Sequence, residues 1–213
     1  MTSKIYSVKE IFYTIQGEGG QSGRPAVFCR FSGCNLWSGR EEDRSKAICQ
    51  FCDTDFWGVD GENGGKYSAI ELSQKVKSLW PENTSGIPLV VCTGGEPLLQ
   101  LDAELIGAFH SHHLEIALET NGTIEVPKNI DWICVSPKAN TELKQCSGHE
   151  LKLVYPQKDI SPEQFIHWPF QFFFLQPMDG PDIKQNTELT IQYCMKNPQW
   201  RLSLQTHKLV GLK

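Results

Sequence analysis

Three of the eight cysteines have a spacing that could hold a metal group, because they form the pattern Cys34-x14-Cys49-x2-Cys52. Cysteine thiolates bind zinc and iron–sulfur clusters, and Cys-x-x-Cys pairs occur in both kinds of site. Cys146 and Cys194 have no cysteine partner at ligand spacing. The other three lie inside apolar runs, which predicts that they are buried as small hydrophobic residues: Cys29, Cys92 and Cys134.

The residue types leave three chemistries open for this trio. A structural zinc site needs a fourth ligand, and His149 and His207 have no partner at ligand spacing. A redox-active Cys49-x-x-Cys52 pair would leave Cys34 without a role. A [4Fe–4S] cluster held by three thiolates would leave one iron open to the amino and carboxylate groups of a methionine moiety, such as that of S-adenosylmethionine (SAM).

The segment Thr93-Gly-Gly-Glu-Pro97 helps to distinguish these alternatives. Its glycines allow the backbone to approach a ligand closely, and Glu96 could accept hydrogen bonds from an ammonium group. Alone, the segment is equally typical of a tight turn. About forty residues after a cysteine trio, it resembles the signature of the radical SAM superfamily.

The elements that must position these residues alternate between strands and helices. Eight short apolar runs predict strands in a sheet that is buried on both faces: Val8–Tyr13, Ala26–Phe31, Pro88–Cys92, Leu114–Leu118, Trp132–Val135, Leu151–Tyr155, Phe170–Leu175 and Trp200–Leu204. Caps and apolar periodicity predict three helices and a short one in the charged insert: from Ser68 with a capping box to Glu71, Leu98–His110, Thr187–Lys196 capped by Asn186, and Ser38–Arg44 capped through Ser38 and Glu41.

Polar or glycine-rich clusters follow nearly every predicted strand. They begin at Gly33, Thr93, Glu119, Ser136, Gln176 and Gln205. In parallel α/β folds, the carboxyl ends of the strands meet at the active site. The pattern therefore predicts an α/β fold with a partial, open parallel βα barrel, and the resemblance implies that this barrel is of the radical SAM type.

Length and composition set further bounds. With 213 residues, the chain is expected to form a single domain over residues 1–213. A net charge of −5 argues against nucleic-acid binding. The N-terminus has no secretory signal and no window is apolar enough for a membrane span, so we expect a cytoplasmic protein with reduced thiols.

The long cysteine spacing resembles that of the 7-carboxy-7-deazaguanine synthases, in the branch with an expanded cluster loop. Further stretches share this resemblance: Ile11–Gly19, Phe28–Leu36, Cys52–Asp55, Glu119–Gly122, Val135–Lys138, Gln176–Gly180 and Gln205–Lys208. The resemblance implies a lyase that converts 6-carboxy-5,6,7,8-tetrahydropterin to 7-carboxy-7-deazaguanine with loss of ammonia, in queuosine and 7-deazapurine biosynthesis. It also implies a [4Fe–4S] cluster, SAM and Mg²⁺ as cofactors, a flavodoxin or ferredoxin-type reductant, and a homodimer.

The same resemblance assigns roles to individual residues. It implies that Cys34, Cys49 and Cys52 bind the cluster and that Thr54 binds Mg²⁺, both as catalytic groups. The implied SAM contacts are Phe51, Cys52, Asp53, Gly95, Glu96, Ser136, Pro137, Lys138, Gln176, Pro177, Met178 and Asp179. The implied substrate contacts are Ile15, Gln16, Gly17, Arg30, Thr93, Glu119, Asn121, His207 and the last residue, Lys213, although the ending Leu-Val-Gly-Leu-Lys departs from the family pattern.

Alternatives accompany these assignments. A charged Arg30 in an apolar strand needs an anion, which is either the substrate carboxylate or a structural ion-pair partner. Two other functions would use the same cysteines. One is a glycyl-radical-enzyme activating protein of the radical SAM superfamily, and the other is a zinc-stabilised binding module.

Overall fold

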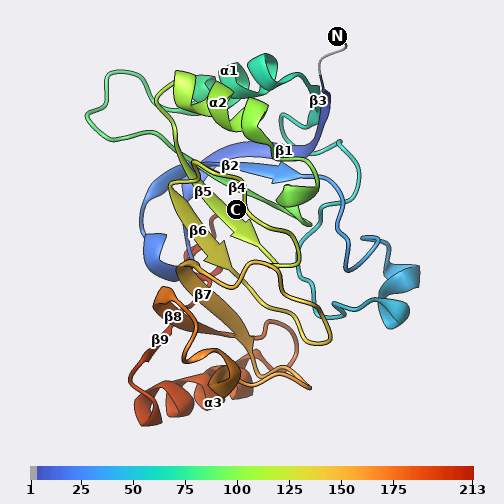
Figure 1. The fold of residues 1–213 in the computed structure, drawn as a ribbon, viewed down its shortest axis with the longest axis vertical. Coiled ribbons are helices and arrows are strands. Elements are labelled where there is room, and N and C mark those ends of the chain that lie inside the picture. The colour runs from blue at the N-terminus through green and yellow to red at the C-terminus, as the bar shows by residue number, and fades with distance from the viewer. Residues whose placement is uncertain (1–3) are drawn as a thin grey trace.

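The computed structural model describes residues 4–213. The first three residues of the domain expected over 1–213 lie outside the described residues. One sheet of nine strands organises the fold (Figure 1). The strands are β1 (Tyr6–Ile15), β2 (Pro25–Phe31), β3 (Gly65–Tyr67), β4 (Leu89–Gly94), β5 (Glu115–Thr120), β6 (Trp132–Val135), β7 (Gly148–Tyr155), β8 (Phe170–Pro177) and β9 (Trp200–Leu202).

The sheet is mostly parallel and open. Its order is β3-β1-β2-β4-β5-β6-β7-β8-β9, so β3 and β9 are its two edges. From β2 through β9 every neighbouring pair is parallel, whereas β1 pairs antiparallel with both β2 and β3. This arrangement confirms the prediction of an open parallel α/β fold. All eight predicted strands are present, and the additional β3 has only three residues at an edge, too few for a recognisable pattern.

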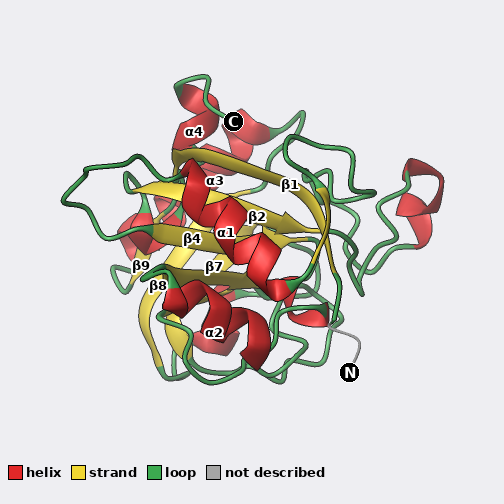
Figure 2. Ribbon diagram, turned by 90° about the horizontal axis from the view of Figure 1, so that it is seen from above, coloured by secondary structure: helices red, strands yellow, loops and turns green. Residues whose placement is uncertain are grey.

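Helices cover the outer face of the sheet (Figures 1 and 2). The α-helices are α1 (Ala69–Leu79), α2 (Ala103–Ser111), α3 (Ile183–Lys196) and α4 (Thr206–Leu209), and the 3₁₀ helices are η1 (Gly19–Gln21), η2 (Glu41–Lys46), η3 (Pro97–Leu99) and η4 (Pro162–Phe165). None of the helices within residues 4–213 has the length and apolar character needed to cross a membrane.

Two hydrophobic cores lie on the outer side of the sheet. The larger one packs α1 and α2 against β1, β2, β4 and β5 through residues such as Leu72, Val90 and Leu105. The smaller one packs β7, β8 and β9 near α3 and η4, with Leu151, Leu175 and Trp200 at its centre. Because both helical layers lie on the same side, the carboxyl ends of the strands stay accessible for a binding site.

The structure corrects three helix predictions. The segment Leu98–His110 does not form one helix, because η3 ends at Leu99 and Asp102 then caps α2 by accepting from the Leu105 N–H at 3.1 Å. The helix predicted from Thr187 begins four residues earlier, at Ile183, and the side chain of Asn186 donates to the carbonyl of Met178 instead of capping it.

The third correction concerns the charged insert. The predicted helix Ser38–Arg44 is the 3₁₀ helix η2 and begins only at Glu41. The Ser38 hydroxyl donates to Asp43 rather than capping the helix together with Glu41. The insert extends away from the body of the molecule in both ribbon views (Figures 1 and 2).

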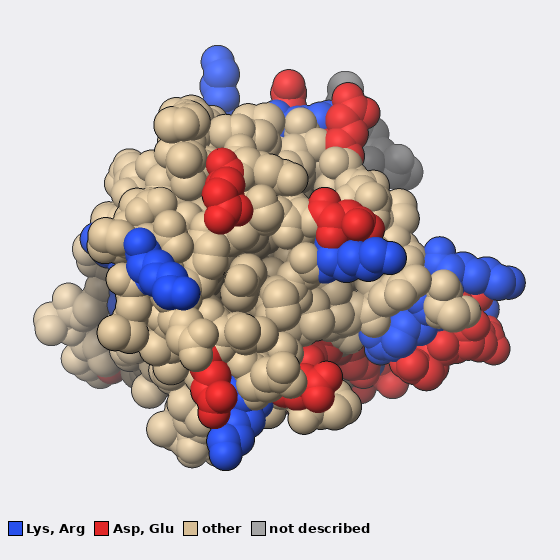
Figure 3. Space-filling view, turned by 90° about the horizontal axis from the view of Figure 1, so that it is seen from below, with Lys and Arg blue, Asp and Glu red and all other residues tan. Residues whose placement is uncertain are grey.

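Seen from below, the surface of the molecule carries charges of both signs in scattered positions, within a mainly uncharged area (Figure 3). This face therefore has no broad basic area of the kind that binds a nucleic-acid backbone.

Candidate active site

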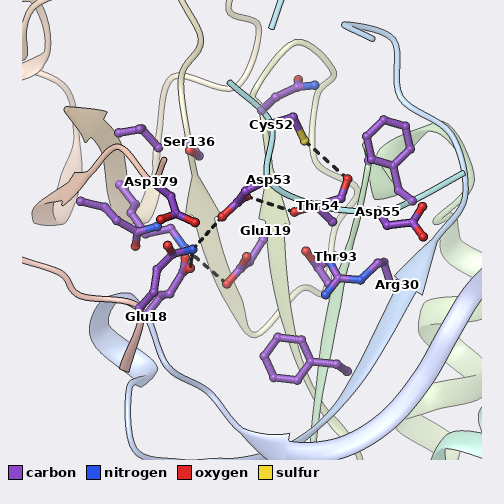
Figure 4. A pocket seen from close by; sticks show the side chains of 18 of the residues that line it. Glu18, Arg30, Cys52, Asp53, Thr54, Asp55, Thr93, Glu119, Ser136 and Asp179 are labelled. Carbon is purple, nitrogen blue, oxygen red and sulfur yellow. Dashed lines mark hydrogen bonds and ion pairs between the residues drawn. The ribbon is translucent and has the colours of Figure 1, made fainter. Parts of the chain in front are cut away.

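A cavity of about 350 Å³ lies at the carboxyl ends of the strands (Figure 4). Its wall includes the segments after β1, β2, β4, β5, β6, β8 and β9, and the loop that carries Cys49 and Cys52. The clusters that follow the predicted strands thus converge on one space. The predicted residues that line it are Ile15, Gln16, Arg30, Cys34, Cys49, Phe51, Cys52, Asp53, Thr54, Thr93, Gly95, Glu119, Asn121, Ser136, Lys138, Gln176, Pro177, Asp179, His207 and Lys213.

The three cysteines occupy one end of this cavity. Cys34 follows β2, and its Sγ accepts a hydrogen bond from the Leu36 N–H at 3.4 Å. Burial raises the pKa of all three thiols, while the ammonium of Lys138 partly offsets this for Cys49 and Cys52. The side chains are close enough to influence one another electrostatically, so they form one group of donors.

Three thiols that face one cavity could serve a single ion or a cluster. Four ligands of a tetrahedral zinc ion lie about 3.8 Å apart, given Zn–S bonds of about 2.3 Å. Within residues 4–213, no three Cys, His, Asp or Glu side chains are close enough to hold one metal ion. In a four-iron cluster each cysteine binds a different iron, so its sulfurs stand farther apart. Three thiols lining one cavity are the donor set that a cluster with one open iron needs.

Four of the predicted contacts do not line the cavity. Glu96 is fully buried beneath it, where its carboxylate accepts from the Leu98 and Asn121 N–H groups and from the Thr120 hydroxyl. This network ties the loop after β4 to the end of β5. The side chain of Glu96 thus has a structural role in addition to any contact with SAM.

The other three contribute backbone interactions to the wall. The Gly17 carbonyl accepts from the N–H and hydroxyl of Thr206, which fixes the start of α4. A Cβ at Gly17 would lie 2.1 Å from Nδ1 of His207, so only glycine fits there. Pro137 accepts from Gln157, and the Met178 N–H donates to the Tyr155 carbonyl.

Charged side chains dominate the opposite end of the cavity, which lies away from Cys52 in Figure 4. Glu119 Oε1 accepts from Gln16 Nε2 at 2.9 Å and lies 3.5 Å from Lys152 Nζ. The same ammonium lies 2.5 Å from Glu18 Oε2. These contacts connect the end of β1 with β5 and β7, which are far apart in the sequence.

Arg30 has the structural partner that the sequence left as an alternative. Its Nε donates to Glu10 Oε1 at 2.9 Å across the β1–β2 pair, and Lys213 Nζ lies 2.7 Å from the other oxygen of Glu10. Arg30 still lines the cavity, and neither of its terminal nitrogens has a hydrogen-bond partner among residues 4–213. The guanidinium could therefore also bind an anionic ligand group.

A third group of charges joins the cysteine loop to α4. Lys208 Nζ lies 2.6 Å from both Asp53 and Asp179, and Gln205 bridges Asp53 to Glu18. Burial opposes ionisation of Asp53, but its hydrogen bonds with Lys208 and Gln205 hold the pKa of this carboxyl below its ordinary value.

The ammonium of Lys138 and the hydroxyl of Thr54 complete the wall near the cysteines. The Lys138 ammonium donates to the carbonyl and hydroxyl of Ser136 at 2.7 Å, and burial lowers its pKa. The Thr54 hydroxyl lies 3.4 Å from Asp53 Oδ1, and Thr54 is half-buried. A hydroxyl in such a position is free to meet a metal ion together with ligand oxygens and water.

Sequence reasoning missed several charged residues of this wall: Glu10, Glu18, Asp55, Lys152 and Lys208. Lys152 had a visible signal, since it interrupts the apolar run of β7 as Arg30 interrupts that of β2. A charged group in a buried strand needs a partner or a function. Glu18 lies within the stretch Ile11–Gly19, where the resemblance assigns roles only to Ile15, Gln16 and Gly17.

The chain is similar to known proteins over nearly its whole length. No protein-family profile matches the chain. It is 62% identical to the 7-carboxy-7-deazaguanine synthase of Caulobacter vibrioides over 97% of this chain and 99% of that protein. The synthases of Bradyrhizobium diazoefficiens and Burkholderia multivorans are 57% and 56% identical, each over at least 97% of this chain and 99% of the relative.

A solved structure agrees as well. The crystal structure of QueE from Escherichia coli aligns with a TM-score of 0.68 and 25% identity, covering 94% of this chain and 93% of that one. Both the sequences and the fold thus correspond over nearly the full length. The chain belongs to the 7-carboxy-7-deazaguanine synthase family.

Proposed function

We propose that this protein is a radical SAM lyase that converts 6-carboxy-5,6,7,8-tetrahydropterin to 7-carboxy-7-deazaguanine with loss of ammonia, in queuosine biosynthesis. The observation that carries the proposal is the composition of one cavity. Three thiols lie at one end, and at the other end are a carboxylate, an amide and a guanidinium. The family membership supports the same reaction.

Cys34, Cys49 and Cys52 would hold a [4Fe–4S] cluster with one open iron, and SAM would bind beside it. When bound, these groups supply the one-electron reduction and the hydrogen-atom abstraction that start such a reaction. The protein contributes placement and charge. Lys138 and Asp179 line the cavity and present an ammonium and a carboxylate to the polar groups of SAM, together with Ser136, Gln176 and the loop at Gly95.

The charged end has the groups that a pterin would need. Glu119 can accept hydrogen bonds from the N–H groups of the amino-pyrimidinone edge, and Gln16 and Asn121 can donate or accept beside it. The terminal nitrogens of Arg30 match the substrate carboxylate. Thr93 lines the same cavity and lies opposite Arg30 in the β2–β4 pair, so it would contact the substrate as well.

Mg²⁺ is the third proposed cofactor. Thr54 would bind it through its hydroxyl, and substrate oxygens and water would complete the octahedral shell that Mg²⁺ requires. A flavodoxin or ferredoxin-type protein would deliver the electron. The protein would act in the cytoplasm, where its thiols remain reduced, as a homodimer.

Anaerobic reconstitution with iron and sulfide tests the proposal. The protein should become brown, and with dithionite and SAM it should convert 6-carboxytetrahydropterin to a product with the mass of 7-carboxy-7-deazaguanine. A colourless protein that binds one zinc ion would favour the binding module. A brown protein that cleaves SAM but leaves the pterin unchanged would contradict the assigned substrate and favour a glycyl-radical activating protein.

A further inference from the structure

Lys152 is a buried ammonium between two carboxylates of the cavity. Its side chain is only 5% exposed, and Leu151 and Leu153 flank it in β7. Its Nζ contacts Glu18 Oε2 at 2.5 Å and Glu119 Oε1 at 3.5 Å. Burying a lysine is costly unless its charge is paired, so this position has a specific electrostatic role.

The two carboxylates are not equivalent. Glu18 uses both oxygens, because Oε2 meets Lys152 and Oε1 accepts from Gln205 at 2.9 Å. Glu119 uses only Oε1, and its Oε2 has no hydrogen-bond partner among residues 4–213. Glu119 therefore keeps an acceptor for a ligand, whereas Glu18 serves as a second counter-charge for Lys152 (Figure 4).

The pKa of Lys152 and the pKa of Glu18 depend on each other. Burial alone would lower the pKa of Lys152, but Glu119 and Glu18 raise it well above its ordinary value. Burial likewise opposes ionisation of Glu18, yet Lys152 holds the pKa of Glu18 below its ordinary value. Other titratable or charged groups on neighbouring elements surround Lys152, Glu18 and Glu119. They are Asp53, Cys134, Lys138, Glu150, His207 and Lys208. Among these, burial raises the pKa of Glu150, which makes it a weak counter-charge.

We propose that Lys152 is a positioning residue that keeps Glu119 ionised and oriented to accept the N–H groups of the substrate's amino-pyrimidinone edge. This inference rests on the proposed function. Without the ammonium, Glu18 and Glu119 would share a buried site with no cation between them, and one of the two would bind a proton. A protonated Glu119 would present an O–H group to the N–H donors of the substrate, and the hydrogen bond would be lost.

The Lys152→Met variant of the reconstituted enzyme tests this. At neutral pH its KM for 6-carboxytetrahydropterin should rise about tenfold or more, because each unit by which a required group's pKa exceeds the pH costs a factor of ten. The increase in KM should diminish as the pH is raised, and kcat should change less than KM. Lys152→Arg should restore most of the affinity. Lys158→Met, in the exposed loop after β7, is the matched control and should leave KM unchanged.

Charge balance provides a second test. The double variant Lys152→Met/Glu18→Gln removes one carboxylate together with the cation, so its pH profile should return toward that of the wild type. Glu18→Gln alone keeps the cation and should show no alkaline shift. Iron content and circular dichroism establish that each variant is folded. An increase in KM that is the same at every pH, or a double variant no better than Lys152→Met, would overturn the proposal in favour of a merely structural role.

Binding of oxidised pterin-6-carboxylate, followed by its fluorescence, separates this inference from the proposed function. A wild type that binds the pterin without converting 6-carboxytetrahydropterin would contradict the reaction, while the pH dependence of binding in Lys152→Met still decides the role of Lys152. A wild type that neither binds this pterin nor converts 6-carboxytetrahydropterin would overturn both. Conversion by the wild type, with an unshifted profile in Lys152→Met, would overturn only the role of Lys152.

Discussion

The two ends of the cavity differ in how they are built. The cysteine end comes from the end of β2 and one loop, and its thiols make only a few weak hydrogen bonds, such as Cys52 to the Thr54 carbonyl at 3.9 Å. The charged end joins β1, β5, β7 and the segment before α4 through short contacts among Gln16, Glu18, Glu119 and Lys152.

This difference has a functional meaning. Thiols without strong protein partners are available to bind a cofactor, which then becomes the organising element of that end. Side chains that are already paired are preorganised, so a ligand meets them with little rearrangement. The cysteine end therefore depends on a group supplied from outside, whereas the charged end is largely complete in the protein. Four substitutions test this contrast.

The largest effect is expected at the cysteine end. Cys49→Ala removes one of three cluster ligands, so the reconstituted variant should lose its iron and all lyase activity. The measurement is iron per chain together with product formation. Cys146→Ala is the matched control, because Cys146 Sγ only contacts the Leu143 carbonyl at 3.6 Å. A Cys49→Ala enzyme with full iron content would contradict the assignment.

At the charged end, Glu119→Gln replaces an acceptor with a group that also donates. Hydrogen bonds to charged groups contribute about 1.5–3 kcal/mol, so KM for the pterin should rise by about one to two orders of magnitude. Iron content should not change. Glu115→Gln, at the other end of β5 and paired with Arg24 at 2.9 Å, should leave KM unchanged. Equal effects at both positions would mean that Glu119 only supports the fold.

A smaller effect is expected where the chain approaches itself closely. Gly17→Ala would place its Cβ 2.1 Å from His207 Nδ1 and 2.8 Å from the His207 nitrogen, so α4 must shift. We expect about a tenfold loss in kcat/KM, since small displacements of positioning groups reduce turnover strongly. Gly107→Ala in α2, where nothing lies within 4 Å, should instead leave kcat/KM unchanged. Full activity of Gly17→Ala would show that α4 does not position the substrate.

The smallest effect is a pH dependence of stability. Burial lowers the pKa of His207 below 6.5 in the folded protein. As the pH falls from about 6.5 to the lower pKa of the folded protein, the unfolded chain binds more protons than the folded one. The free energy of unfolding should therefore decrease over that range and level off below it. Urea unfolding at several pH values should show a shallower decrease for His207→Gln. An identical slope in both proteins would indicate that His207 does not contribute.

Much of the fold was predictable because it depends on local patterns. Apolar runs identified eight strands, and the capping box at Ser68 marked the start of α1, where both of its hydrogen bonds are formed. The break between η3 and α2 was not predictable from periodicity, since the apolar pattern of Leu98–His110 continues across it. Asp102, which caps α2, also accepts hydrogen bonds from Lys4 and Tyr6 at the start of the chain, and only the fold brings these residues together.

The candidate site, like the fold, was predictable only in part. The sequence by itself determined the trio Cys34, Cys49 and Cys52 and the clusters at the strand ends, because residue type and spacing carry that information. Only the tertiary structure decided that Arg30 pairs with Glu10 and that Glu96 lies beneath the cavity. It also decided that Lys152 lies between Glu18 and Glu119. These contacts join residues up to 134 positions apart, and which charges meet at such separations is fixed by strand order and register.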